Sequence, residues 1–221
     1  MPDATRSRAH TIPYPVDLRP YLTPSGPEPA RAALELDNSA TVLYLSTLQV
    51  RKRPDIVIDA IARLESRSPA LQAVVAGPGT TIEVERVRRL VDRRSVQDRV
   101  LLPGLVTGDV KLSLLALADV LVLPTSAENF GIVLIEALAC GTPVITTKGT
   151  SIWRELEASG GCVIVDQSVD AVAVAVETLL GDEDRRGQMG KAGREWALRT
   201  FEPRALAAQY SSMYEKAVAG S

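Results

Sequence analysis

A chain of 221 residues in which 46% are hydrophobic is long enough to bury the core of one large domain. Its 25 basic and 27 acidic residues leave a net charge of −2, and only 4% are aromatic, so a nucleic-acid partner is not expected. The two cysteines and single histidine make neither a disulfide framework nor a metal-ligand pattern, and no apolar run is long enough to span a bilayer. We therefore expect a cytoplasmic protein with reduced thiols and no metal site.

The first 40 residues differ from the rest of the chain. Seven of the first 31 are prolines, and IPYPVDLRPYLTPSGPEP is unsuited to a helix or an inner strand because proline lacks a backbone N–H. We expect residues 1–40 to form an extended interdomain linker, here called the arm, with one short helix over 30–36. Such an arm is expected to expose its apolar side chains, which are Ile12, Tyr14, Val16, Leu18 and Tyr21.

From residue 41 to 221 the pattern predicts one Rossmann-like domain. Short apolar strands are expected at 41–47, 71–77, 99–104, 119–126, 143–147 and 162–165. Helices are expected at 53–66, 82–95 and 110–118, from about 131, and at 151–159, 168–180, 182–199 and 203–218. Continuous apolar strands alternating with helices indicate an α/β fold, a doubly wound parallel sheet of about six strands. In such sheets ligands bind at the carboxyl ends of the strands.

Two of these strand ends carry a recognisable pattern. Arg51, Lys52 and Arg53 precede a helix, and cations beside a helix N-terminus suit a phosphate, although a solvated basic loop is the alternative. The second strand ends in Gly77-Pro78-Gly79, which indicates a tight turn. Because Ile82 stands where a dinucleotide fingerprint needs its third glycine, a nicotinamide-dependent oxidoreductase is not expected.

The stretch SAENFGIVLIEALACGTPVI places two carboxylates, Glu128 and Glu136, eight positions apart around the start of a helix. Glu136 stands among apolar residues, where a charge is costly unless it is paired or hydrogen-bonded. A ligand with several hydroxyl groups, such as a ribose or a hexose, would suit these acids; an exposed Glu136 on a helix edge is the alternative. Gly131 has no Cβ, so a ligand can approach the backbone there, and Gly141 is expected to end the helix.

Together, RVLLPGLV and ADVLVLPTSAENFGIVLIEALACGTPVI resemble the C-terminal, donor-binding domain of retaining glycosyltransferases with the GT-B architecture, family 4 type, or glycosyl transferases group 1. That family has an E-x7-E element, matched by Glu128 and Glu136, followed by A-x-A-x-G-x-P-V. IPYPVD resembles the linker that joins the two halves of such enzymes. The resemblance covers about residues 10–218.

The resemblance implies a hexosyltransferase that uses a nucleotide-diphosphate sugar as donor and needs no metal or other cofactor. Glu128 would bind hydroxyls of the donor sugar, and Lys52 would steady the diphosphate leaving group; these are the candidate catalytic residues. Glu136 would bind the nucleotide ribose. The other implied donor-binding residues are Thr47, Arg51, Gly104, Leu105, Asn129, Phe130, Gly131 and Ile132.

The sequence departs from the family at one phosphate-binding position. Family members usually carry arginine in a GRL element, whereas this chain has Ser46-Thr47-Leu48. A threonine can hydrogen-bond a phosphate but adds no charge, and Arg51 or Arg53 would have to compensate.

The chain also matches only the linker and the second half of such enzymes. We therefore expect an N-terminal acceptor-binding domain or subunit as a partner. Because related enzymes act on lipid-linked acceptors, peripheral association with the inner face of the membrane is a further expectation. The alternative is a degenerate nucleotide-binding or protein-interaction module without transferase activity.

Overall fold

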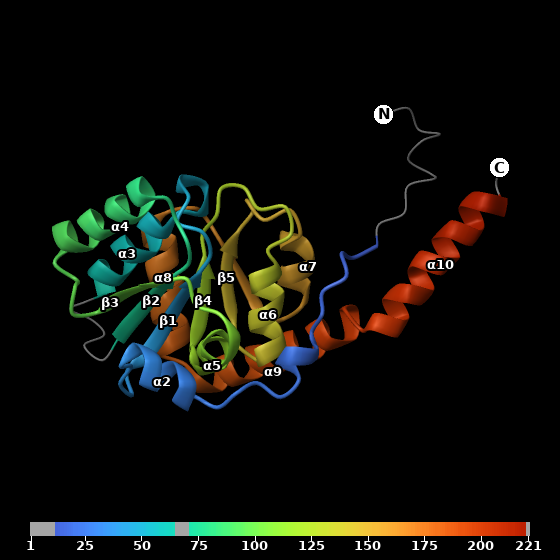
Figure 1. Ribbon diagram of the computed structural model, residues 1–221, viewed down its shortest axis with the longest axis horizontal. Helices are drawn as coiled ribbons and strands as arrows, with labels where there is room; N and C mark the ends of the chain where they lie inside the picture. The colour runs from blue at the N-terminus through green and yellow to red at the C-terminus, as the bar shows by residue number, and fades with distance from the viewer. Residues whose placement is uncertain (1–11, 65–70, 220–221) are drawn as a thin grey trace.

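The computed structural model describes residues 12–64 and 71–219, and its centre is a six-stranded parallel sheet (Figure 1). The strand order is β3-β2-β1-β4-β5-β6, so the chain reverses direction across the sheet between β1 and β4. The predicted doubly wound α/β fold is confirmed. The strands are β1 (Ala40–Leu45), β2 (Leu71–Ala76), β3 (Val100–Gly104), β4 (Val120–Leu123), β5 (Val144–Thr147) and β6 (Cys162–Val165).

Helices cover both faces of this sheet (Figure 1). On one side pack α3 (Pro54–Leu64), α4 (Thr81–Arg94) and α8 (Val169–Leu180). On the other side pack α2 (Glu28–Leu34), α5 (Gly108–Leu117), α6 (Ile132–Cys140) and α9 (Glu183–Thr200), and the short α7 (Trp153–Ala158) lies beside β6. The final helix, α10 (Pro203–Ala219), extends away from the sheet. Because both faces are covered, every residue of β4 is fully buried.

The turn after β2 shows why glycine is required there. Gly77 has φ of +143°, and a Cβ at this position would lie 1.8 Å from the backbone oxygen of Ser46. Helix α4 then starts with a capping box, in which the Thr80 side chain accepts from the Glu83 N–H and the Glu83 carboxylate accepts from the Thr80 N–H at 2.8 Å. The predicted tight strand-to-helix turn is therefore confirmed. Gly141 ends α6 in the left-handed conformation, also as predicted.

The arm is more folded than its prolines suggest. A single 3-10 turn, η1 (Arg19–Tyr21), forms because proline is tolerated in the first turn of a helix. The predicted short helix is α2, which starts two residues earlier than expected. Of the arm residues expected to be exposed, Tyr14 is 60% exposed, but Val16, Leu18 and Tyr21 are buried. The first eleven residues of the arm and the predicted end of the helix at 65–66 lie outside the described residues.

Polar contacts tie the arm to the helices beneath it. Ser113 on α5 accepts from the N–H of Ala30 at 3.0 Å and donates to the carbonyl of Gly26 at 2.7 Å. Arg194 on α9 donates to the carbonyls of Tyr21 and Leu22 at 3.1 and 2.6 Å. The expected exposure was wrong for Val16, Leu18 and Tyr21, because these side chains join the hydrophobic core of the domain, and the polar contacts hold the backbone around Tyr21 in place.

Candidate active site

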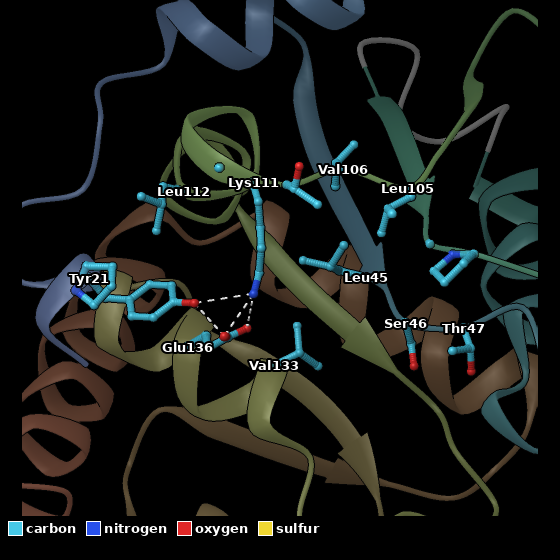
Figure 2. Close-up of a pocket in the computed structure, with 15 residues that line it drawn as sticks. Tyr21, Leu45, Ser46, Thr47, Leu105, Val106, Lys111, Leu112, Val133 and Glu136 are labelled. Atoms are coloured by element: carbon cyan, nitrogen blue, oxygen red, sulfur yellow. Dashed lines mark hydrogen bonds and ion pairs between the residues drawn. The ribbon is translucent and has the colours of Figure 1, made fainter. Parts of the chain in front are cut away.

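A cavity of about 550 Å³ opens at the carboxyl ends of β1, β2 and β3, between α5, α6 and the arm (Figure 2). It lies beside the point where the strand order reverses, the usual ligand position in such sheets. Three of the residues predicted from the sequence line it, namely Thr47, Leu105 and Glu136. Leu45, Val106 and Val133 give it apolar walls.

Glu136 is the charged centre of this cavity and is not alone there. The hydroxyl of Tyr21, from the arm, donates to Glu136 Oε1. The Nζ of Lys111, on α5, lies 2.8 Å from each carboxylate oxygen and 3.3 Å from the Tyr21 hydroxyl. Figure 2 shows the three side chains meeting from three different elements. Glu136 is only 9% exposed, so the alternative of an exposed acid on a helix edge was wrong.

Burial has a clear effect on the phenol in this cluster. It raises the pKa of Tyr21 far above its usual value, and the hydrogen bond to the negative Glu136 raises it further. Tyr21 therefore stays protonated and keeps a hydrogen to donate. The partners of Glu136 were not predicted, although Lys111 gave a signal of the same kind as Glu136, since it is a charge in the apolar run VKLSLLALA.

Glu128 and Lys52 form a second charged pair. Lys52 ends a 3-10 turn, η2 (Val50–Lys52), and is 5% exposed; its ammonium group forms an ion pair with Glu128 Oε2. Burial alone would raise the pKa of Glu128. The hydrogen bond and charge of Lys52, together with the N–H groups of Phe130 and Gly131, outweigh burial and hold this pKa below its ordinary value. Glu128 is therefore a carboxylate at neutral pH.

The two candidate catalytic residues are thus brought together, and the backbone around Glu128 is well supported. The Glu128 N–H donates to the carbonyl of Gly149, and the Glu128 carbonyl accepts from the N–H of Ser151, both at 2.9 Å. Close packing requires glycine at 149, because a Cβ there would lie 2.2 Å from the carbonyl oxygen of Thr125. These contacts fix Glu128 between β4 and β5.

The other members of the basic run also contact protein groups. Arg51 donates to the carbonyl of Ala127 at 2.9 Å, and its own carbonyl accepts from Ser126 at 2.8 Å. Arg53 forms an ion pair with Asp55 at 2.8 Å. Both arginines therefore brace their own loops, and neither lines the 550 Å³ cavity.

Thr47 lines the cavity, but its hydroxyl is buried. Its backbone carbonyl accepts from the Tyr44 hydroxyl at 2.7 Å, but its Oγ1 is buried without a hydrogen-bond partner among the described residues. A buried unpaired hydroxyl costs about 1–3 kcal/mol.

The remaining predicted residues fall into two loops. Gly104 has φ of +75° and its carbonyl accepts from the Gly77 N–H at 2.7 Å, while Leu105 after it is 67% exposed at the cavity rim. Asn129 and Ile132 are exposed at the start of α6.

The segment that opens α6 combines close packing with aromatic contacts. Gly131 adopts φ of +71°, and a Cβ there would lie 2.9 Å from Leu134 Cδ1. The ring of Phe130 packs edge-on against Tyr14 at 5.8 Å and Phe201 at 6.0 Å between ring centroids. The ring of Phe130 therefore packs against the arm and the turn before α10, so only the backbone of Phe130 is directed to the candidate site.

Two general features complete the site. Within residues 12–64 and 71–219 there is no group of three or more acidic, histidine or cysteine side chains that could hold a metal ion. Among the helices within residues 12–64 and 71–219, none has the length and hydrophobicity that a membrane-spanning segment requires.

The sequence and fold of this chain are shared with known proteins. The family model for glycosyl transferases group 1 matches residues 28–196. The chain belongs to this family. A GDP-mannose-dependent alpha-(1-6)-phosphatidylinositol monomannoside mannosyltransferase of Mycobacterium tuberculosis is 34% identical over 93% of the chain. A D-inositol 3-phosphate glycosyltransferase of Corynebacterium glutamicum is 30% identical over 98% of it.

Solved structures share the fold. The sucrose-phosphate synthase of Thermosynechococcus elongatus superposes with a TM-score of 0.82 and 29% identity, over 96% of this chain and 53% of that protein. The present chain spans 58% of the mycobacterial relative and 54% of the corynebacterial one, a little over half of each.

Proposed function

We propose that this chain is the donor-binding domain of a retaining, metal-independent family 4 glycosyltransferase with the GT-B architecture. In this proposal it transfers a sugar from a nucleotide-diphosphate sugar to an acceptor. The observation that carries it is Glu136, a buried carboxylate in a partly apolar cavity at the ligand end of the sheet. A ribose offers hydroxyl donors to such an acid, and a base fits the apolar walls near Leu105.

The charged groups support roles for the diphosphate and the sugar. Glu128, ionised and fixed by its loop, would accept hydroxyls of the donor sugar. Lys52 would bridge Glu128 and the departing phosphate, and the N-terminus of α6 would add positive potential. These charges supply the leaving-group stabilisation for which other enzymes use a metal ion. Thr47 lines the cavity and would donate its hydroxyl to a phosphate oxygen only after its side chain rotates, because the Oγ1 atom is buried.

The relatives suggest which donor and which partners to try first. The mycobacterial relative is named for GDP-mannose and for a phosphatidylinositol mannoside acceptor. GDP-mannose is therefore our first candidate donor. An N-terminal acceptor-binding domain or subunit is the proposed protein partner, and peripheral association with the inner face of the membrane, on the cytoplasmic side, would give access to a lipid-linked acceptor.

The second candidate function is a nucleotide-binding or interaction module without transferase activity. Two observations favour it. Thr47 replaces the family's arginine, and the Lys52 ammonium is already engaged by Glu128.

Calorimetric titration with GDP, UDP and ADP, with and without EDTA, tests the proposal. We expect one of them to bind irrespective of EDTA, and Glu136→Gln to weaken that binding at least about tenfold, since a hydrogen bond to a charged group contributes about 1.5–3 kcal/mol. Glu195→Gln, at an exposed carboxylate on α9, is the matched control and should bind as the wild type does. A folded chain that binds none of the three would overturn the proposal and favour the module.

A further inference from the structure

Tyr21 is a residue of the arm that forms part of the donor cavity. Its side chain lines the cavity together with Pro20 and Glu136, and the residue is 6% exposed (Figure 2). The hydroxyl donates to Glu136 Oε1, a contact between residues 115 positions apart. A segment that precedes the first strand therefore touches the acid proposed to bind the ribose.

The backbone around Tyr21 is held in place by a separate set of contacts. The Arg194 guanidinium donates to the carbonyls of Tyr21 and Leu22, and also to the carbonyl of Ala139 in α6. Just before the turn, Asp17 accepts from the N–H of Arg19 at 3.0 Å. One arginine thus joins the arm to the helix that carries Glu136, which fixes the distance between the phenol and the carboxylate.

The contacts of Glu136 are not shared equally between its two oxygens. Oε1 accepts hydrogen bonds from the Tyr21 hydroxyl and from Lys111, whereas Oε2 has only an ion-pair contact with the Lys111 ammonium, at 2.8 Å, among the described residues. An ionised carboxylate offers about four acceptor positions over its two oxygens. Oε2 therefore keeps capacity for a donor, and the contacts of Oε1 set the direction in which Oε2 points.

We propose that Tyr21 is a positioning residue for the donor nucleotide, acting through Glu136. Its hydroxyl holds Oε1, so that Oε2 is oriented to accept a ribose hydroxyl. Nucleotide affinity then depends on the docking of the arm as well as on residues of the sheet. This inference rests on the proposed donor-binding function.

The test is Tyr21→Phe, which removes one oxygen and keeps the ring in the cavity wall. GDP, or whichever of GDP, UDP and ADP binds the wild-type chain, is titrated by calorimetry alongside its 2′,3′-dideoxy analogue. We expect Tyr21→Phe to lower the affinity for the natural nucleotide about tenfold. Its affinity for the dideoxy analogue should stay within about twofold of the wild-type value, because the analogue has no ribose hydroxyls that Glu136 could bind.

Tyr210→Phe is the matched control. Tyr210 also donates its hydroxyl to the arm, to the carbonyl of Pro13 at 3.2 Å, but it does not line the cavity. This variant should bind both nucleotides as the wild type does. Arg194→Gln, which loosens the arm without altering a cavity residue, should reproduce a smaller loss that is again confined to the natural nucleotide.

The outcomes separate the two proposals. A folded wild-type chain that binds no nucleotide overturns the proposed function, and this inference falls with it. Suppose instead that the wild-type chain binds a nucleotide. If Tyr21→Phe then binds both the natural nucleotide and its analogue with unchanged affinity, or with affinity reduced equally for both, the proposed function stands and the role of Tyr21 is overturned. If circular dichroism shows that Tyr21→Phe is unfolded, Arg194→Gln takes its place. A loss of affinity confined to the natural nucleotide then supports the role of Tyr21, and an equal or absent loss for both nucleotides overturns it.

Discussion

Replacing Glu128 and replacing Lys52 both break the Lys52–Glu128 ion pair, but the two substitutions should lower the free energy of unfolding by unequal amounts. The side chain of Lys52 is 6% exposed and that of Glu128 is 19% exposed. Glu128→Gln therefore leaves an ammonium group with almost no water. Lys52→Met leaves a carboxylate that is better hydrated and still accepts from the Phe130 N–H at 3.5 Å.

The magnitudes follow from this difference in burial. Removing one partner of a fully buried pair costs about 3–5 kcal/mol, whereas an exposed pair contributes at most about 1 kcal/mol. We expect Glu128→Gln to lower the free energy of unfolding by about 3 kcal/mol. Lys52→Met should lower it by about 1.5 kcal/mol, because the methylene groups of methionine keep the packing of the lysine side chain. At about 2–4 °C per kcal/mol for a protein of this size, the melting temperature should fall by about 6–12 °C and 3–6 °C.

Urea unfolding at pH 7 and below measures both effects. Because Lys52 holds the pKa of Glu128 below its ordinary value of 4.5, the stability from the pair is fully present above that value and is lost as pH falls through the lowered one. The difference in free energy of unfolding between wild type and Lys52→Met should therefore become smaller as the pH falls. If Lys52→Met lowered the free energy of unfolding as much as Glu128→Gln, or if both lowered it by less than about 0.5 kcal/mol, burial would not determine the cost of breaking this pair.

Two further predictions concern the packing of the domain. Gly77→Ala should destabilise the domain by about 3 kcal/mol or more in urea unfolding, because the new Cβ would clash with the Ser46 carbonyl and the backbone has a positive φ. The control Gly187→Ala, at a helical position with open space around it, should be neutral or slightly stabilising. Equal effects of the two substitutions would contradict this prediction. Burial raises the pKa of Cys140 to about 11 and that of Cys162 further. Cys162, which is buried, should therefore react with Ellman's reagent at pH 8 only after denaturation, whereas the partly buried Cys140 should react slowly in the folded chain. Rapid labelling of Cys162 in the folded chain would count against its buried placement.

The sheet could be predicted because its strands carry their own signal. Buried parallel strands are apolar on both faces, and turn residues separate them, so β6 was predicted with its observed bounds. β4 was predicted too long, at 119–126. Pro124 and Thr125 are buried like strand residues, but Thr125 directs its hydroxyl to the carbonyl of Arg51 at 3.0 Å and the strand ladder has already ended. Burial and strand pairing are separate properties, and only burial is visible in a hydrophobic pattern.

The candidate site was predictable only in part. A charge in an apolar helix is costly unless it is paired or hydrogen-bonded, and of the two alternatives for Glu136, paired or exposed, the structure shows the paired one. It could not identify Tyr21 or Lys111, which lie 115 and 25 positions away. The basic run had a similar limit, because sequence gives the charge of Arg51 and Arg53 but not the direction in which each side chain points.

Both acids of the E-x7-E element share a feature that bears on function. Each is neutralised by a lysine from another part of the chain, Lys52 for Glu128 and Lys111 for Glu136. Replacing a buried ion pair by well-packed apolar residues is often neutral or stabilising by about 1–4 kcal/mol, so stability alone gives no reason to keep the buried Lys52–Glu128 pair. Lys111 is more exposed than Lys52, and the Lys111–Glu136 pair lines the 550 Å³ cavity, which Lys52 and Glu128 do not. Paired charges do, however, provide both acceptors for hydroxyl groups and donors for phosphates at fixed positions. Under the proposed function, the two pairs would serve recognition of a ligand that carries both groups, as a nucleotide-diphosphate sugar does.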